Sequence, residues 1–345
     1  MTAVLTEVST AGSQRATASR RRALVIGCLV LGIVVLFATA TMVGSVMLTP
    51  ADVIGGILGT AEPSTVFVVR ELRLPRALAA VLIGLALGAS GTLFQRVLGN
   101  PLASPDFLGV AEGAGTATVA ALVFGAAGVA LPVCALLGGA LTAAVIGFVA
   151  WNRGLTAYRF ILVGIGVSAF ATSVTSYLLA RAEFRDARAA ITWLVGSVGM
   201  ASPESLTLLA VVLVLFIPAG LFAARALNTL ELGDDSARTL GARVQGERLA
   251  VIAIAVVLVS VATAAAGPIA FVAMLAGPLV AIPLGSAGRS ILAAALMGVV
   301  IIQIADLLAQ HALPWPVSTG VVTGVFGAPY IAWVLISSAR KAGAQ

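Results

Sequence analysis

Most of the charged side chains that could bind a partner in this sequence are arginines. Arg70, Arg73 and Arg76 follow one another at intervals of three residues. Residues three apart share a face of a helix, so Arg73 and Arg76 could together meet carboxylates of an acidic partner. They could equally lie along a membrane surface with their charged ends in water. Spacing alone leaves docking and surface anchoring open.

A second segment, residues 95–105, has a composition that suits a gate. Gly99, Pro101 and Pro105 exclude a regular helix there. Irregular backbone near membrane depth is tolerated only where it is buried in protein or lines a cavity. The text Asn100–Pro105 is weakly similar to Gly277–Pro283, as inverted repeats would be. The composition favours a gate or pathway lining over a plain loop.

A third segment, residues 225–248, is the largest polar loop between apolar stretches. Asp234 or Asp235 can cap a helix, and Gly241 can end it. The resulting helix of two turns or fewer is hardly stable alone in water, so it must pack on something. A cytoplasmic partner and the protein's own helix ends are equally good candidates.

Two carboxylates, Glu112 and Asp306, lie within or beside apolar stretches. Ionisable groups in membrane segments are functional candidates by default. No charged partner is evident for either in a neighbouring stretch, and Asp306 lies close to a predicted helix end. A helix cap or a hydrogen-bonded core carboxyl is therefore favoured. The alternative is a proton- or sodium-coupled secondary transporter that uses both carboxylates.

Groups for covalent or metal chemistry are scarce. Cys28 and Cys134 stand alone in apolar runs, and His311 is the single histidine, so no zinc site is expected. The single lysine, Lys341, does not follow a phosphate-binding glycine loop. We therefore expect a non-enzymatic chain that binds no metal or cofactor itself. If ATP drives the protein, another chain binds the ATP.

Composition shows which elements must position these residues. The chain has 345 residues, of which 60% are hydrophobic and 10% charged, with a net charge of +6 and a mean hydropathy of +1.10. Soluble domains carry about 25% charged residues. This composition excludes a soluble enzyme, a nucleic-acid-binding protein and a disordered chain. It predicts an all-α, polytopic membrane protein.

Uncharged stretches long enough for a bilayer predict about ten transmembrane helices. They are 23–51, 77–95, two within 113–152 divided at Pro132, 160–180, 205–224, two within 249–288 broken near Gly267-Pro268, 290–305 and 319–339. The short stretch 189–203 is expected to be a membrane-surface helix.

Ten helices place both termini on one side of the membrane. Arg15, Arg20, Arg21 and Arg22 indicate that this side is the cytoplasm. The predicted organisation is a cytoplasmic tail at 1–22, one transmembrane domain at 23–339 and a cytoplasmic tail at 340–345. The outer loops then hold six basic residues, namely Arg70, Arg73, Arg76, Arg181, Arg185 and Arg188.

Many of these segments together resemble the permease subunits of iron-siderophore and vitamin B12 importers of the ATP-binding-cassette (ABC) class, the FecCD family. The similar text is Arg73-Leu74-Pro75-Arg76, Gly88-Ala89-Ser90-Gly91, Gln95, Asn100-Pro101-Leu102-Ala103, Pro105, Leu108-Gly109, Trp193 through Ser197, Leu227-Asn228, Leu232-Gly233-Asp234-Asp235 through Leu240-Gly241, Gly267 through Val272, Ala305-Asp306 and Gly324 through Pro329. It extends from about residue 70 to the C-terminus.

The resemblance implies a ten-helix type II importer permease that alternates access between the two membrane faces. It pairs with a second permease copy or paralogue, two cytoplasmic ATPases that bind ATP and Mg, and an extracytoplasmic solute-binding protein. A ferric siderophore is the expected solute, with haem or cobalamin as the alternative. No nucleic acid is involved.

The resemblance also implies roles for individual residues. Arg73 and Arg76 look like the arginines that meet acidic side chains of the binding protein. The cytoplasmic gate has two layers, and the coupling helix rests on the ATPase. The gate layers are Asn100, Pro101 and Leu102, and Thr156, Ala157 and Tyr158; the coupling helix comprises Leu232, Gly233, Asp234, Asp235, Ala237, Arg238, Leu240 and Gly241.

The sequence departs from the family pattern at three places. Gly277-Pro278-Leu279 stands where the family usually has Pro-His followed by Arg. Gln310, followed by His311, replaces a common basic residue. Trp315-Pro316-Val317-Ser318 lacks a frequent acidic residue. These changes put a third basic docking point in doubt, and with it any solute assigned by analogy.

Overall fold

The structure is a computed structural model, and it describes residues 2–105, 109–126, 128, 130–151, 156–284 and 290–342. Regular elements in these ranges are all helical. They are α1 (Thr2–Met42), α2 (Pro50–Leu58), α3 (Pro63–Phe67), η1 (Val68–Arg73), α4 (Leu74–Leu98), α5 (Val110–Val123), α6 (Ala130–Ala150), α7 (Ala157–Arg181), α8 (Phe184–Val195), η3 (Val198–Met200), α9 (Pro203–Leu230), α10 (Asp234–Thr239), α11 (Val244–Ala266), α12 (Val272–Leu284), α13 (Ile291–His311) and α14 (Thr319–Ala342).

The all-α membrane fold is confirmed. Seven helices in the described ranges are long and apolar enough to cross a membrane, and α5 and α12 are shorter apolar helices. Each of the ten expected spans overlaps mainly with one helix, although 23–51 also reaches the start of α2, and the expected break near Gly267-Pro268 follows Ala266. The short segment expected at 189–203 forms α8 and the turn η3. A total of ten spans, with both termini in the cytoplasm, stays a prediction.

Several predicted boundaries were wrong. The first helix ends at Met42 rather than 51, because Thr49 caps a new helix at Pro50. It also begins at Thr2, since no proline interrupts residues 2–42; that residues 1–22 form a cytoplasmic tail stays a prediction. The break in 113–152 precedes Ala130, because Pro132 lies in the first turn of α6, where its missing N–H costs nothing.

The polar loop at 225–248 is shorter than expected. α9 continues to Leu230 and α11 begins at Val244, so only residues 231–243 connect the two long helices. Within this connection lies the six-residue helix α10. At the other end of the chain, α14 extends to Ala342, so part of the expected 340–345 tail is also helical. Leu108, quoted above as part of a motif, lies outside the described residues.

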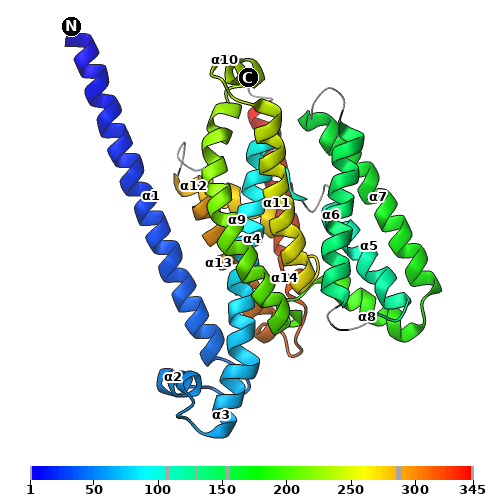
Figure 1. Ribbon diagram of the computed structural model, residues 1–345. Coiled ribbons are helices and arrows are strands. Elements are labelled where there is room, and N and C mark those ends of the chain that lie inside the picture. Colours follow the sequence, from blue (N-terminus) through cyan, green and yellow to red (C-terminus); the bar gives the residue numbers. More distant parts are fainter. Residues whose placement is uncertain are drawn as a thin grey trace.

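Helix α4 forms the centre of the molecule, packed against α9, α11, α12 and α13. Small residues let α13 approach it closely: a Cβ on Gly88 would lie 2.3 Å from the carbonyl oxygen of Ala294. Close backbone approach of this kind is typical of packing between membrane helices. In Figure 1, α5, α6, α7 and α8 form a group beside this centre, and α1 leans away from it.

The two ends of the helix bundle carry different candidate sites. Figure 1 places α10, the start of α1 and the end of α14 at one end, here called the α10 end. The opposite end holds α2, α3 and α8. It is called the arginine end, because η1 and the start of α4 carry Arg70, Arg73 and Arg76.

Candidate functional site

At the arginine end, each of the three arginines bonds to a different element. Arg70 donates to the carbonyl oxygens of Gly56 and Ile57 in α2, with Nη2 2.6 Å from the latter. Arg73 donates through Nη1 to the carbonyl of Met42 at 2.8 Å, and also to those of Thr41 and Val46. Carbonyls at a helix C-terminus lack intrahelical donors and carry partial negative charge. Arg70 and Arg73 therefore fasten α2 and α1 to the start of α4.

Arg76 forms a two-pronged ion pair with Asp306 of α13. Its Nε lies 3.0 Å from Oδ2 and its Nη2 lies 2.9 Å from Oδ1. The absence of an evident partner for Asp306 was therefore a wrong expectation. The Asp306 side chain is 6% exposed and that of Arg76 29%. The preference for a hydrogen-bonded core carboxyl over an ion-coupling group is consistent with this arrangement.

Asp306 accepts two further hydrogen bonds. Gln310 donates to Oδ2 and Thr319 to Oδ1, both at 2.8 Å. Thr319 begins α14, and its hydroxyl oxygen accepts from the Val198 amide of η3 at 3.3 Å. One carboxylate thus connects α4, α13, α14 and η3. Four donors satisfy its charge in a setting where water is scarce.

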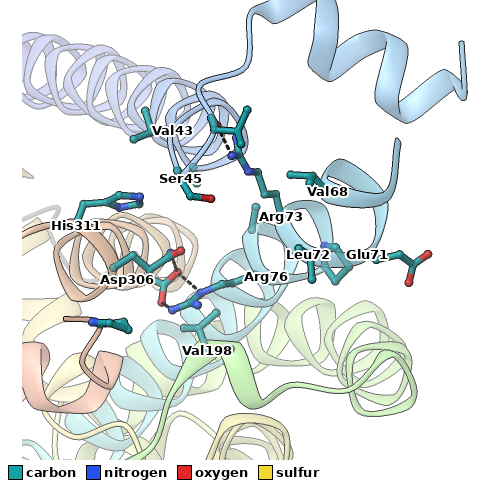
Figure 2. A pocket seen from close by; sticks show the side chains of 18 of the residues that line it. Val43, Ser45, Val68, Glu71, Leu72, Arg73, Arg76, Val198, Asp306 and His311 are labelled. Atoms are coloured by element: carbon teal, nitrogen blue, oxygen red, sulfur yellow. Dashed lines mark hydrogen bonds and ion pairs between the residues drawn. The ribbon is translucent and has the colours of Figure 1, made fainter. Parts of the chain in front are cut away.

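A cavity of about 540 Å³ opens beside this network. Arg73, Arg76, Asp306 and His311 line it, together with the end of α1. Figure 2 shows Arg73 and Arg76 extending in opposite directions from the start of α4, one toward α1 and the other toward Asp306. The two predicted docking arginines therefore share one cavity while serving different partners within the chain.

At the α10 end, the first predicted gate layer follows directly from the end of α4. The Asn100 amide donates to the carbonyl of Gln95 at 3.0 Å, and Asn100 Oδ1 accepts from the Leu102 amide at 2.9 Å. These bonds fold the chain into a tight turn. Pro101 is exposed and Leu102 half-buried.

The second predicted gate layer lies at the start of α7. Thr156 precedes α7 and is exposed, and Tyr158 is 76% exposed; the side chain of Ala157 lies outside the described set. A cavity of about 510 Å³ is lined by Asn100 and Pro101, and among the described side chains Thr156 and Tyr158 do not line it. The same cavity is lined by Gly277 and Pro278, so the two weakly similar segments of the sequence lie side by side.

Helix α10 is short, as predicted. Ala237 is fully buried, and Asp234 Oδ1 pairs with Arg248 Nη2 of α11 at 2.8 Å. Asp235 pairs with Arg238 on the surface at 3.1 Å. The helix thus packs on the protein's own α11.

The flanks of α10 remain available to a partner. Leu232 and Leu240 are 61% and 66% exposed, and each is followed by a glycine, Gly233 before the helix and Gly241 after it. The geometry is compatible with both alternatives, internal packing of α10 and docking of a cytoplasmic partner.

Sequence reasoning missed some polar partners. Arg76 and Asp306 were each assigned to the same side of the membrane, and that shared position was the signal that could have paired them. Arg96 pairs with Glu231 at 2.8 Å and donates to Asn228 at 2.7 Å. The separation of these residues along the sequence does not indicate this contact. Glu112 lies half-buried in the first turn of α5, where the helix dipole favours a negative charge.

Comparison with known proteins agrees with this architecture. The ferric enterobactin permease FepG of Escherichia coli is 38% identical over 86% of this chain and 91% of its own length. The achromobactin permease CbrC of Dickeya dadantii is 36% identical over 85% and 86%. The Fe(3+)-citrate permease YfmE of Bacillus subtilis is 33% identical over 93% and 97%.

The fold has a solved counterpart. An ABC transporter assigned to the metal-chelate type, solved in an inward-facing conformation, superposes with a TM-score of 0.81. It covers 90% of this chain and 98% of its own, at 24% identity. The model of the FecCD transport family matches residues 31–337. With nearly the whole helical bundle inside that match, the chain belongs to the FecCD transport family.

Proposed function

We propose that this protein is the permease subunit of an ABC importer that moves a ferric siderophore across the inner membrane by alternating access. The observation that carries the proposal is the family match over residues 31–337, joined to relatives named for ferric enterobactin and achromobactin. Haem or cobalamin, carried by the same kind of machine, is the alternative solute.

The proposed assembly contains a second permease subunit, two ATPases that hold ATP and Mg, and an extracytoplasmic binding protein. The sequence supports a separate ATPase because its single lysine, Lys341, follows no phosphate-binding loop. The exposed Leu232 and Leu240 beside α10 suit a groove on that ATPase. The α10 end then faces the cytoplasm and the arginine end faces outward.

Arg73 and Arg76 are the proposed docking points for the binding protein. Both line the cavity at the arginine end. Asp306 takes Nε and Nη2 of Arg76, and Nη1 is the nitrogen left to reach an acidic side chain. Charge complementarity of this kind steers encounter and fixes register more than it adds affinity.

The gate proposal keeps both predicted layers. Asn100, Pro101 and Leu102 form the layer beside the cavity at the α10 end. Thr156, Ala157 and Tyr158, at the start of α7, form the second layer, and the exposure of Tyr158 leaves it free to meet a second permease subunit.

A secondary transporter is the candidate from another class. Neutralising Asp306 does not separate the two classes, because it also deprives Arg76 of its partner. Glu112→Gln is the cleaner variant. It abolishes transport if Glu112 couples an ion, and leaves ATP-driven uptake largely intact in the proposed importer.

The deciding experiment measures uptake of radiolabelled ferric enterobactin, haem and cobalamin by cells that lack the gene. Cells regain uptake with the unmodified gene but not with Arg73→Glu plus Arg76→Glu. Arg70→Glu is the matched control, because Arg70 also bonds backbone carbonyls but does not line the cavity. Full uptake by the reversed pair would refute docking. A gene that restores none of the three solutes would refute the solute assignment.

A further inference from the structure

Helix α12 contains a proline that removes one backbone hydrogen bond, and a side chain of another helix replaces the missing donor. Pro278 has no N–H, so the carbonyl of Met274, four residues earlier, loses its helical donor. Gln95 of α4 donates to this oxygen through Nε2 at 2.9 Å. Met274 is 3% and Gln95 8% exposed. Because both residues are buried, the side-chain amide takes over the bond that the missing N–H cannot make.

Gln95 also anchors the turn that carries the first gate layer. Its backbone carbonyl accepts the Asn100 amide at 3.0 Å, while its side chain reaches α12. The approach is possible because residue 277 is glycine: a Cβ there would lie 2.3 Å from Gln95 Oε1. One side chain therefore joins the gate turn to the α12 carbonyl that Pro278 leaves without a helical donor.

The beginning of α12 is strained. Phe271, immediately before it, has φ of 70°, the one positive value among the described non-glycine residues. Bulky residues rarely adopt this conformation unless their surroundings enforce it. Phe271 packs against Gly327 of α14. A Cβ added to Gly327 would lie 2.5 Å from the Cβ of Phe271. Phe271, just before α12, and Pro278 within it are thus two places where the backbone departs from a regular helix, the first in its dihedral angle and the second in its hydrogen bonding.

We propose that Gln95 is a positioning residue that holds α12 bent at Pro278, and that remaking this bond accompanies opening and closing of the gate. Residues 278–284 then move relative to α4 while the first part of α12 stays in place. The cavity lined by Pro101 on one side and Pro278 and Ala281 on the other is where the movement takes place. This inference rests on the proposed importer function.

The test follows a reporter on the moving segment. Cys28 and Cys134 are replaced by serine, and Ala281→Cys, on the wall of the cavity, supplies the single thiol. The permease is assembled with its second subunit, ATPases and binding protein in nanodiscs. A water-soluble maleimide labels the thiol with and without ATP plus vanadate, and no transported solute is required. Thermal unfolding is measured on the same samples.

Three variants separate bending from simple stabilisation. Gln95→Leu leaves the Met274 carbonyl without a donor, so we expect a lower Tm and no nucleotide response. Pro278→Ala returns the N–H, so we expect an unchanged Tm but a loss of the nucleotide response, which is at least about fivefold in the unmodified protein. The double variant, Gln95→Leu with Pro278→Ala, should recover the Tm of the unmodified protein but not its nucleotide response. Pro283→Ala, the control in the same helix, keeps both.

Each other result has a definite meaning. A double variant that regains the nucleotide response as well as Tm shows that Gln95 is merely structural, and overturns the proposal. A normal response in Pro278→Ala also overturns it, because α12 then does not bend there. If the reporter in otherwise unmodified protein does not respond to ATP, residues 278–284 do not move with nucleotide and the proposal is overturned, whereas the importer function is tested separately by the uptake experiment.

Discussion

Helices α12 and α13 both pack on α4, yet they are held by different means. α13 meets α4 through glycine contacts at its middle and the Arg76–Asp306 ion pair at its end. α12 is also close at its first turn, where a Cβ on Gly91 would lie 1.8 Å from the Ala273 carbonyl oxygen. Beyond that turn it contains two prolines and depends on one neutral bond from Gln95.

The difference suggests a division of labour around one central helix. An ion pair with two parallel hydrogen bonds is strong and directional, so α13 and α4 behave as one body. A single neutral hydrogen bond is weak enough to be exchanged. Transport by alternating access needs both kinds of contact: a fixed frame, and a part that moves within it.

The contact expected to give the largest effect is the glycine crossing of α4 and α13. Gly88→Leu forces the two helices apart, because even a Cβ would lie 2.3 Å from the Ala294 carbonyl oxygen. We expect a loss of more than about 3 kcal/mol and little folded protein. Size-exclusion chromatography of the solubilised protein measures this. Gly27→Leu in α1, where a Cβ meets nothing within 4 Å, is the control and should remain folded.

Asp306→Asn tests the ion-paired end of the same contact. Removing the charge leaves Arg76 uncompensated at a site where the carboxylate is 6% exposed. Breaking buried pairs costs 3–5 kcal/mol, and the 29% exposure of Arg76 reduces this to about 2 kcal/mol. The Tm in detergent should fall accordingly. Gln310→Leu, which removes one neutral donor, should cost less; equal losses would contradict the dominance of the ion pair.

Thr92→Val, a change in α4 where it faces α12, tests the contact between these two helices. Thr92 Oγ1 is buried and has no hydrogen-bond partner among the described residues. It faces Gly277 of α12, where a Cβ would lie 3.1 Å away. Exchanging this hydroxyl for a methyl group should raise stability by about 0.5–1 kcal/mol. Ser90→Ala in the same helix should do the opposite, because Ser90 donates to the Ala255 carbonyl at 2.7 Å.

The smallest effect is expected at α2, outside both contacts. Hydrogen bonds from the Thr49 side chain, and then from its backbone, lower the pKa of Asp52 below its usual 3.8. A lowered pKa stabilises the fold above the ordinary value, and this is lost as pH falls through the folded-state value. Asp52→Asn should therefore lower Tm slightly at neutral pH, and the gap should close as the pH falls below 3.8 and through the lowered folded-state pKa. A gap independent of pH would contradict this assignment.

Sequence patterns predicted the helices better than the contacts between them. Uncharged length located each long helix, and Gly267-Pro268 located the break before α12, because both signals are local. Pro132 was misjudged since a proline breaks a helix in its interior but begins one in its first turn. The end of α1 was missed because residues 43–49 are as uncharged as a span.

The candidate sites were predicted in part. Arg73 and Arg76 do lie together on one cavity, as their spacing suggests, and α10 is as short as its glycines predict. Their partners had no local signal: Arg76 meets a residue 230 positions away, which only their shared side of the membrane could have indicated, and the donor for Met274 comes from another helix. Such pairs depend on how helices cross, which apolar periodicity does not encode.

The central place of α4 has a consequence for how the protein is made. All four of its main neighbours, α9, α11, α12 and α13, follow it in the chain. At a synthesis rate of 5–20 residues per second, the 230 residues between Arg76 and Asp306 take about 10 to 50 s to emerge. During that time α4 must reside in lipid, with Arg76 held at the membrane surface. Helix α4, which lies at the centre of the folded protein, is therefore made before the helices that cover it. A ribosome stalled before α13 would leave Arg76 of α4 without Asp306, and quality-control proteases could then recognise the unpaired helix.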